Sequence, residues 1–172
     1  MSTYFHRYTV PVILLLLLCT ALSCRHVTPG RKFKIAFSQC TDDNYRRRML
    51  ADIRRELAFH PEVDFLFRDA KDNSQLQVQQ VKELVDEHID LLIISPNEAQ
   101  PLTGIVEEVF NKGIPVIVLD RTIASRLYTS FIGADNFELG EMAGDYAASL
   151  LHNKGKIVEV TGRPSSTPAI CG

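Results

Sequence analysis

The chain has 172 residues, of which 45% are hydrophobic and 23% are charged, a balance typical of a globular protein with room for one ordinary domain. Its formal net charge of −2 and its pI of about 6.2 give no support to a protein that binds nucleic acid or an anionic surface. The basic run Arg46-Arg47-Arg48 lies where a helix is predicted to begin, and such a run is typical of a solvated helix face.

Residues 1–24 have the pattern of an export signal. Arg7 precedes an apolar run at Val10–Leu18, and small residues then lead to Cys24. The apolar run is shorter than a membrane-spanning helix needs. Cys24 resembles the lipid-accepting cysteine of bacterial lipoproteins, with Ala21 where those signals usually have Leu. We expect a lipoprotein signal, with a cleaved signal peptide or an uncleaved anchor as the alternatives, and each places the folded part in the periplasm or cell envelope.

After a short polar tether at residues 25–32, the chain is predicted to alternate strands and helices. The predicted strands are Phe33–Ser38, Val63–Phe67, Asp90–Ser95, Val116–Leu119, Phe131–Gly133 and Ile157–Val160. The predicted helices are Asn44–Phe59, Ser74–His88, Pro101–Lys112 and a last one from Asp135 or Asn136 to about His152. Apolar strands that alternate with helices predict an α/β fold class, a doubly wound parallel sheet with helices on both faces. We assign it to a single lobe at residues 33–163, followed by an irregular tail at residues 164–172.

The groups that common catalytic sites require are missing from the sequence. Ser38–Tyr45, after the first strand, has no glycine for a dinucleotide or phosphate loop, and no Gly-x-Ser-x-Gly motif occurs. A phosphoacceptor receiver would need an aspartate after the third strand, where this chain has Ser95-Pro96-Asn97. The five histidines form no i,i+4 pair that would suggest a metal site. We therefore expect a binding protein without cofactor or metal, and not an enzyme.

Polar residues follow four of the predicted strands. These segments are Gln39–Asn44, Ser95–Glu98, Asp120-Arg121 and Asp135-Asn136. Because the carboxyl ends of parallel strands meet at one edge of a sheet, we expect the four segments to line a common crevice. Asp supplies paired acceptors and Arg a rigid fork of donors, which together suit the neighbouring hydroxyls of a sugar.

Each of these segments also has a purely structural interpretation. Asp120 and Arg121 can form a surface ion pair that closes a turn, and Ser95-Pro96-Asn97 can be an ordinary turn. Asn44 and Asn136 can cap their helices, and Tyr45 can pack on the surface of the lobe.

Four motifs together resemble one family. They are Phe37–Arg46, Asp90–Ala99, Gly113–Arg121, and Tyr128 followed by Ile132–Asn136. The chain resembles, from about Lys32 to Pro168, the amino-terminal lobe of the type I periplasmic sugar-binding proteins. These are the ribose and galactose binders that share their fold with LacI-type regulators. The likeness is greatest to the extracytoplasmic sensors of hybrid two-component systems from gut Bacteroidetes.

The resemblance implies roles for individual residues. Asn44 and Arg46 would reach the ligand from the first loop, and Asp120 with Arg121 would hold sugar hydroxyls. Tyr45 lies where the sensors usually have Trp, which implies stacking with a smaller ring. Ser95 matches a position where the ribose binder uses Asn, and Asn136 matches a further polar contact. The candidate ligand-binding residues are Asn44, Tyr45, Arg46, Ser95, Asp120, Arg121 and Asn136.

The family continues into a second lobe of similar size, and its ligand is buried when the two lobes close. This chain reads Ile170-Cys171-Gly172 where the family has an acidic-basic pair and a helix. We expect the front half of an extracytoplasmic sensor or transport receptor for a monosaccharide or small oligosaccharide. Its partners would be a second lobe and a signalling or transport component, and the chain alone would bind sugar at millimolar affinity or worse unless it dimerises. The alternative is a truncated or frameshifted gene product without independent activity.

Overall fold

The computed structural model describes residues 30–160. The predicted signal with Cys24, most of the predicted tether and the predicted tail lie outside the described residues. The strands are β1 (Phe33–Gln39), β2 (Val63–Asp69), β3 (Leu91–Ile94), β4 (Val116–Leu119) and β5 (Ser130–Ile132). The helices are α2 (Asn44–Leu57), α3 (Ser74–Asp86), α4 (Ala99–Asn111) and α5 (Asn136–Leu150). Helix α4 begins two residues before the predicted start at Pro101, and its N-cap residue, Glu98, makes no side-chain capping hydrogen bond.

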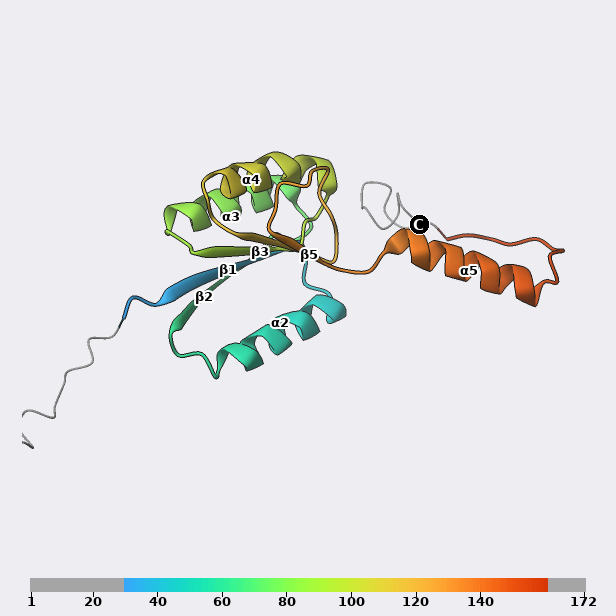
Figure 1. The fold of residues 1–172 in the computed structure, drawn as a ribbon, viewed down its shortest axis with the longest axis horizontal. Coiled ribbons are helices and arrows are strands. Elements are labelled where there is room, and N and C mark those ends of the chain that lie inside the picture. Colours follow the sequence, from blue (N-terminus) through green and yellow to red (C-terminus); the bar gives the residue numbers. More distant parts are fainter. Residues whose placement is uncertain (1–29, 161–172) are drawn as a thin grey trace, which may run out of the picture. The chain divides into compact units, whose positions relative to one another are not determined.

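The described residues form a five-stranded sheet in the order β2-β1-β3-β4-β5, in which every neighbouring pair is parallel. Helices α3 and α4 lie on one face of the sheet and α2 lies on the other (Figure 1). The prediction of an α/β fold with a doubly wound parallel sheet is confirmed. A parallel sheet with this order has its crevice between β1 and β3, because the connections that follow these two strands run to opposite sides of the sheet.

The main core lies between the sheet and helices α3 and α4. Leu92 and Ile94 of β3 and Val116 and Val118 of β4 point to this side and have no solvent exposure. They pack with residues from both helices, namely Val81, Leu84, Leu102, Ile105, Val106 and Val109. Burial alternates along β3 and β4, so the side chains that face the α2 side are only partly buried. At β3 and β4 the cover is therefore complete on the α3–α4 side and partial on the other.

Capping residues fix where three helices begin. Asp43, Asn73 and Asp135 each accept a backbone N–H from the first turn of α2, α3 and α5, respectively. A carboxylate or amide oxygen at this position satisfies N–H groups that otherwise have no partner within the helix. Asn44 and Asn136 are thus the first residues of their helices and not the caps. The caps hold the polar loops at the carboxyl ends of β1, β2 and β5.

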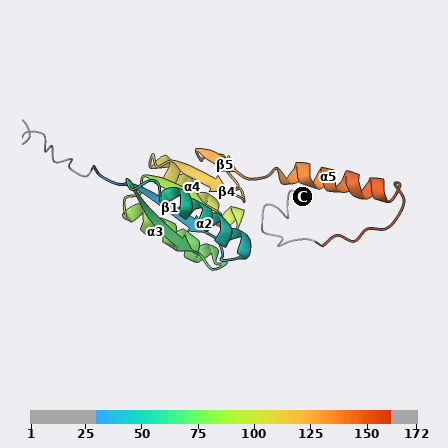
Figure 2. The same cartoon turned by 90° about the horizontal axis from the view of Figure 1, so that it is seen from below.

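The predicted sixth strand is wrong. Residues 156–160 have no regular secondary structure, and Val158 and Val160 are 92% and 93% exposed. The preceding helix α5 forms as predicted, but none of its residues is buried. Figure 2 shows α5 beyond the end of β5. Because α5 does not pack on the sheet, the segment after it does not return to the edge of β5, and its apolar residues have no strand to pair with.

Candidate functional site

Arg46 joins the first loop to the end of β4. It lies in the first turn of α2, and its side chain is only 6% exposed. Its Nη1 donates to the carboxylate of Asp43, and its Nη2 donates to Oδ2 of Asp120 at 2.6 Å. One guanidinium thus holds two carboxylates from parts of the chain that are far apart in the sequence. Charge-assisted bonds of this kind are about twice as strong as neutral ones.

Asp120 occupies a sharp turn directly after β4. Its φ is +65°, in the left-handed region that Asp enters more readily than most residues. The N–H of Arg121 donates to the carbonyl of Leu119 at 2.7 Å, and the N–H of Asp120 donates to Ile132 of β5 at 2.9 Å. Backbone strain at a strand end persists only where surrounding contacts enforce it. Here the two hydrogen bonds and the Arg46 ion pair do so.

Arg121 points its guanidinium toward the loop after β3. Its Nη1 donates to the backbone carbonyl of Asn97 at 2.9 Å, and its Nε lies 4.0 Å from Oδ2 of Asp120. The Arg121 side chain is 20% exposed and that of Asp120 is 26% exposed. Each side chain is therefore held by a contact within the fold and is partly accessible at the open edge of the sheet.

A buried polar network supports the loop after β3. Gln77 of α3 donates to the carbonyl of Ser95 at 3.0 Å and accepts the N–H of Asn97 at 2.9 Å. The Asn97 amide donates to Ser74 at 3.0 Å, and Ser74 donates to Glu98 at 2.9 Å. Because buried polar groups are costly unless paired, such a network fixes the loop in one geometry. Arg121 binds a backbone carbonyl of this fixed loop.

The ion pairs shift two pKa values. Burial raises the pKa of Asp43, but the hydrogen bonds from the backbone and guanidinium of Arg46 outweigh it and place the pKa of this carboxyl below its usual value. Burial lowers the pKa of Arg46, but interactions with Cys40, Asp43 and Asp120 raise it above its usual value. Arg46 therefore stays charged, and Asp43 stays ionised at neutral pH.

The remaining candidate residues of the first loop lie at the surface. Tyr45 is 61% exposed, with the Arg46 guanidinium carbon 5.9 Å from the centre of its ring. Asn44 is exposed, and its Oδ1 accepts a hydrogen bond from Arg47 at 2.5 Å. Ser95 has no exposure, and its Oγ lies 3.8 Å from the thiol of Cys40. Its hydroxyl is enclosed by protein in this structure, whereas Tyr45 and Asn44 face solvent.

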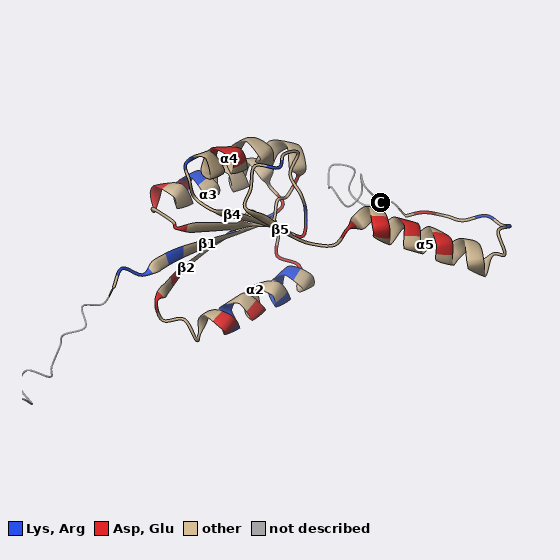
Figure 3. Cartoon of the chain, in the orientation of Figure 1, with Lys and Arg blue, Asp and Glu red and all other residues tan. Residues whose placement is uncertain are grey.

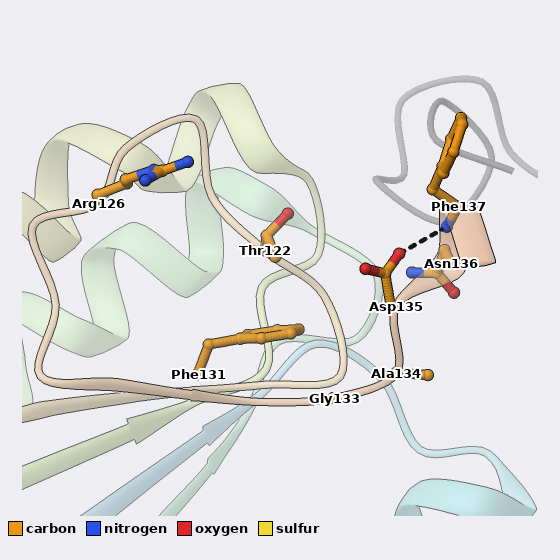
Figure 4. Close-up of a pocket in the computed structure, with 8 residues that line it drawn as sticks. All are labelled: Thr122, Arg126, Phe131, Gly133, Ala134, Asp135, Asn136 and Phe137. Carbon is orange, nitrogen blue, oxygen red and sulfur yellow. Dashed lines mark hydrogen bonds between the residues drawn. The ribbon is translucent and has the colours of Figure 1, made fainter. Parts of the chain in front are cut away.

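Asn136 lines a different part of the surface from Arg46 and Asp120. An open hollow of about 650 Å³ lies between the β4–β5 loop and the start of α5 (Figure 4). Its lining residues include Thr122, Arg126, Phe131 and Asn136. The structure thus brings together Arg46, Asp120 and Arg121. It places Asn136 in a neighbouring hollow, which Thr122 also lines.

Three residues that organise the site were not predicted from the sequence. Asp43 caps α2 and binds Arg46, a pattern that Asp at the N-cap and Arg three residues later could have indicated. Gln77 and Ser74 lie on the same face of α3 as the buried Val81 and Leu84. A polar residue on the apolar face of a predicted helix is the signal for a buried network. The partner atoms, however, depend on the tertiary fold.

No group of three or more His, Cys, Asp or Glu side chains among residues 30–160 is arranged to hold a metal ion. No helix in the described part is both long enough and apolar enough to span a membrane.

Comparison with a family model decides the identity of the fold. The model of the periplasmic binding protein domain matches residues 35–170, which include every described strand but the start of β1. The chain belongs to the periplasmic binding protein family. The expected resemblance to this family is therefore confirmed.

Individual relatives of this periplasmic binding protein domain are similar over part of their length. The ribose import binding protein RbsB of Bacillus subtilis (strain 168) is 29% identical over 99 residues, which are 58% of this chain and 32% of that protein. The D-xylose-binding periplasmic protein of Escherichia coli (strain K12) is 27% identical over 133 residues, which are 75% of this chain and 39% of that protein.

Two solved structures have the same fold. The fructose-binding periplasmic domain of the hybrid two-component system BT1754 is 51% identical with a TM-score of 0.77, and the match covers 80% of this chain and 46% of that one. An ABC transporter solute-binding protein from Bacillus halodurans C-125 with bound myo-inositol is 28% identical with a TM-score of 0.78, and the match covers 83% of this chain and 50% of that one. The chain spans half or less of the length of each of these four proteins.

Proposed function

We propose that this chain forms the amino-terminal part of an extracytoplasmic receptor for a neutral carbohydrate. One observation carries the proposal: Asp120 and Arg121 stand together at the open carboxyl edge of the sheet, each held by a contact on its inner side. Oδ1 of Asp120 and Nη2 of Arg121 have no hydrogen-bond partner among residues 30–160. An acceptor beside a donor fork matches two adjacent hydroxyl groups of a sugar.

The charges at this edge favour an uncharged ligand. The carboxylates of Asp43 and Asp120 are balanced by the guanidinium groups of Arg46 and Arg121. The four groups leave no excess charge to attract an acidic or basic ligand. Exposed Tyr45 adds an aromatic face beside Arg46, on which the apolar face of a sugar ring can stack.

The relatives support a sugar of small size and a role in sensing. Their names describe binding of ribose, xylose and fructose, and one structure holds myo-inositol. The relative with 51% identity is the periplasmic domain of a hybrid two-component system. We therefore propose a sensor rather than a transport receptor, with a further lobe and a signalling component as its partners.

A titration followed by NMR tests the binding. D-fructose, D-ribose, D-xylose and myo-inositol are each added to the chain at up to tens of millimolar, because part of a two-lobed site is expected to bind weakly. We expect the backbone signals of Asp120, Arg121 and Asn97 to shift with at least one of them. Asp120→Gly should reduce the shifts at each sugar concentration, since glycine tolerates the φ of +65° and removes only the carboxylate.

The matched control is Asp52→Ala, which removes an exposed carboxylate of α2 that pairs with Arg48 and Arg55. This variant should bind like the unchanged chain. Shifts that are absent with all four sugars, or that survive Asp120→Gly unchanged, would contradict the proposed site.

We also propose that Cys24 receives a lipid and anchors the protein to a membrane of the cell envelope. The support is the position of Cys24 after an apolar run with the character of an export signal. Expression in a bacterium fed a labelled fatty acid should label the chain, and Cys24→Ser should remove the label. Label that persists in Cys24→Ser would contradict the assignment.

A further inference from the structure

Arg46 is enclosed so completely that a ligand has little of it to contact. Its side chain is 6% exposed, and both terminal nitrogens bind carboxylates. The remaining nitrogen, Nε, is buried and has no hydrogen-bond partner among the described residues. The guanidinium face that is left packs beside the ring of Tyr45. A guanidinium in this position stabilises the fold of the site and leaves little surface for contact with a ligand.

The oxygen that Arg46 binds decides which oxygen of Asp120 remains for other partners. Arg46 holds Oδ2 at 2.6 Å, and Nε of Arg121 lies 4.0 Å from the same atom. Both guanidinium groups therefore approach Asp120 from one side of its carboxylate. Oδ1 has no hydrogen-bond partner among the described residues, and the Asp120 side chain is 26% exposed.

The contact also reaches across β3. Helix α2 follows β1 directly, whereas Asp120 follows β4, and β3 lies between β1 and β4. Two strand spacings amount to about 10 Å, so the contact joins loops whose strands are not neighbours in the sheet. Asp43 at the N-cap of α2 restrains the guanidinium at its near end. The chain Asp43–Arg46–Asp120 thus ties the first loop to the end of β4.

We propose that Arg46 is a positioning residue: it acts on the ligand through Asp120, by fixing Oδ2 so that Oδ1 is presented to a sugar hydroxyl. The proposal rests on the proposed function and replaces the direct contact that the family resemblance implies for Arg46. It assigns ligand contact to Asp120 and Arg121, and orientation to Arg46 and Asp43.

The first test needs no ligand. In the unchanged chain, the two bonds of Arg46 should hinder rotation of its guanidinium, so that its Nη groups give separate signals in nitrogen-proton NMR spectra. Asp120→Gly should release one end and merge these signals. Arg48→Gln, which removes an exposed ion pair of the same helix, is the control and should leave them separate. Arg46 signals that Asp120→Gly does not change would overturn the proposal.

The second test is a double-mutant cycle on affinity for the sugar that gives the largest shifts among the four probes. Arg46→Gln should weaken binding about 10-fold or more, the scale of a hydrogen bond to a charged group. Asp120→Gly should weaken binding at least as much, and the double variant should bind no more weakly than Asp120→Gly alone. Losses that multiply in the double variant would show a separate contact by Arg46 and overturn the proposal.

Arg46→Lys guards against loss of folding in Arg46→Gln. Lysine keeps the charge but lacks the planar fork, so it cannot hold Asp43 and Asp120 at once. It should bind sugar less tightly than the unchanged chain and more tightly than Arg46→Gln. If none of the four sugars binds, the proposed function fails, while the guanidinium signals still decide whether Arg46 orients Asp120.

Discussion

Two regions of this lobe have similar proportions of apolar residues but differ in packing. Around β3 and β4, apolar residues are enclosed by α3 and α4, and polar side chains such as Gln77 and Arg46 are buried with partners. In the region of β5 and α5, large side chains including Phe137, Met142 and Tyr146 are more than half exposed. An apolar pattern therefore specifies a helix, but only a second surface makes it part of a core.

Helix α5 also differs from α2 in its charged residues. Figure 3 shows acidic residues and no basic ones on α5, whereas α2 has both signs. Glu138, Glu141 and Asp145 carry the negative charge of α5.

The side chains that face the α2 side of β3 and β4 are themselves only partly buried. The lobe thus has two apolar surfaces without full cover, one on the helix and one on the sheet.

The largest expected effect is in the packed region. Leu92→Ala in β3 removes a fully buried side chain that faces α3 and α4. It should lower the free energy of unfolding by about 2–5 kcal/mol, because a cavity adds to the lost burial. Chemical denaturation followed by circular dichroism measures this. A loss below 1 kcal/mol, at the scale of a surface change, would show that this side of the sheet is loosely packed.

A smaller loss is expected from the polar network beside the site. Gln77→Leu keeps the size of the side chain but removes the hydrogen bonds of Gln77 to the N–H of Asn97 and the carbonyl of Ser95. The free energy of unfolding should fall by about 1–3 kcal/mol. Gln79→Leu is the matched control on the exposed face of α3, where Gln79 donates to Glu83, and should change the free energy of unfolding by less than about 0.5 kcal/mol. Equal losses in the two variants would contradict a specific role of the network.

Next in size is a pH-dependent effect at Asp43. The pKa of Asp43 lies below its ordinary value in the folded protein, so its ion pair contributes stability at neutral pH that is lost as the pH falls through the folded pKa. Asp43→Asn retains a good cap and removes the charge. It should be less stable than the unchanged chain by about 0.5–1 kcal/mol at neutral pH, because the carboxylate is 46% exposed and partly screened.

The difference between Asp43→Asn and the unchanged chain should shrink when the pH is taken well below 3.8, the ordinary value for Asp. Denaturation at a series of pH values measures it. A difference that stays constant over this range would show that the cap, and not the charge, accounts for the loss.

The smallest effect is expected in α5. Leu139→Ala is the same substitution as Leu92→Ala, but Leu139 is 50% exposed. The free energy of unfolding should change by less than about 0.5 kcal/mol. A loss comparable to that of Leu92→Ala would show that α5 packs against another surface in solution, and the contrast between the two regions would not hold.

The sequence was sufficient for the order and type of the described elements. Apolar runs such as Val116–Leu119, bounded by Gly113 and Asp120, indicated strands without reference to any partner. Gly113, at φ +80°, ended α4 as expected, with its N–H bonded to Phe110. The same reasoning failed at Ile157–Val160, because an apolar segment becomes a strand only if a neighbouring strand edge is within reach.

The candidate site was predicted in part. Adjacent Asp120 and Arg121 at a strand end were found from residue type and position alone. Their inner partners, Arg46 and the carbonyl of Asn97, could not be assigned from the sequence, because 74 and 24 residues separate the bonded pairs. The roles of these residues in ligand binding stay a prediction.

The sequence by itself determined the local elements, since hydrophobic period and capping residues act over a few neighbouring positions. The tertiary structure decided which surfaces are covered and which polar atoms are already bonded. It enclosed Arg46 between two carboxylates and left α5 without buried residues. Those outcomes depend on distances between segments that are remote along the chain, and local sequence does not encode such distances directly.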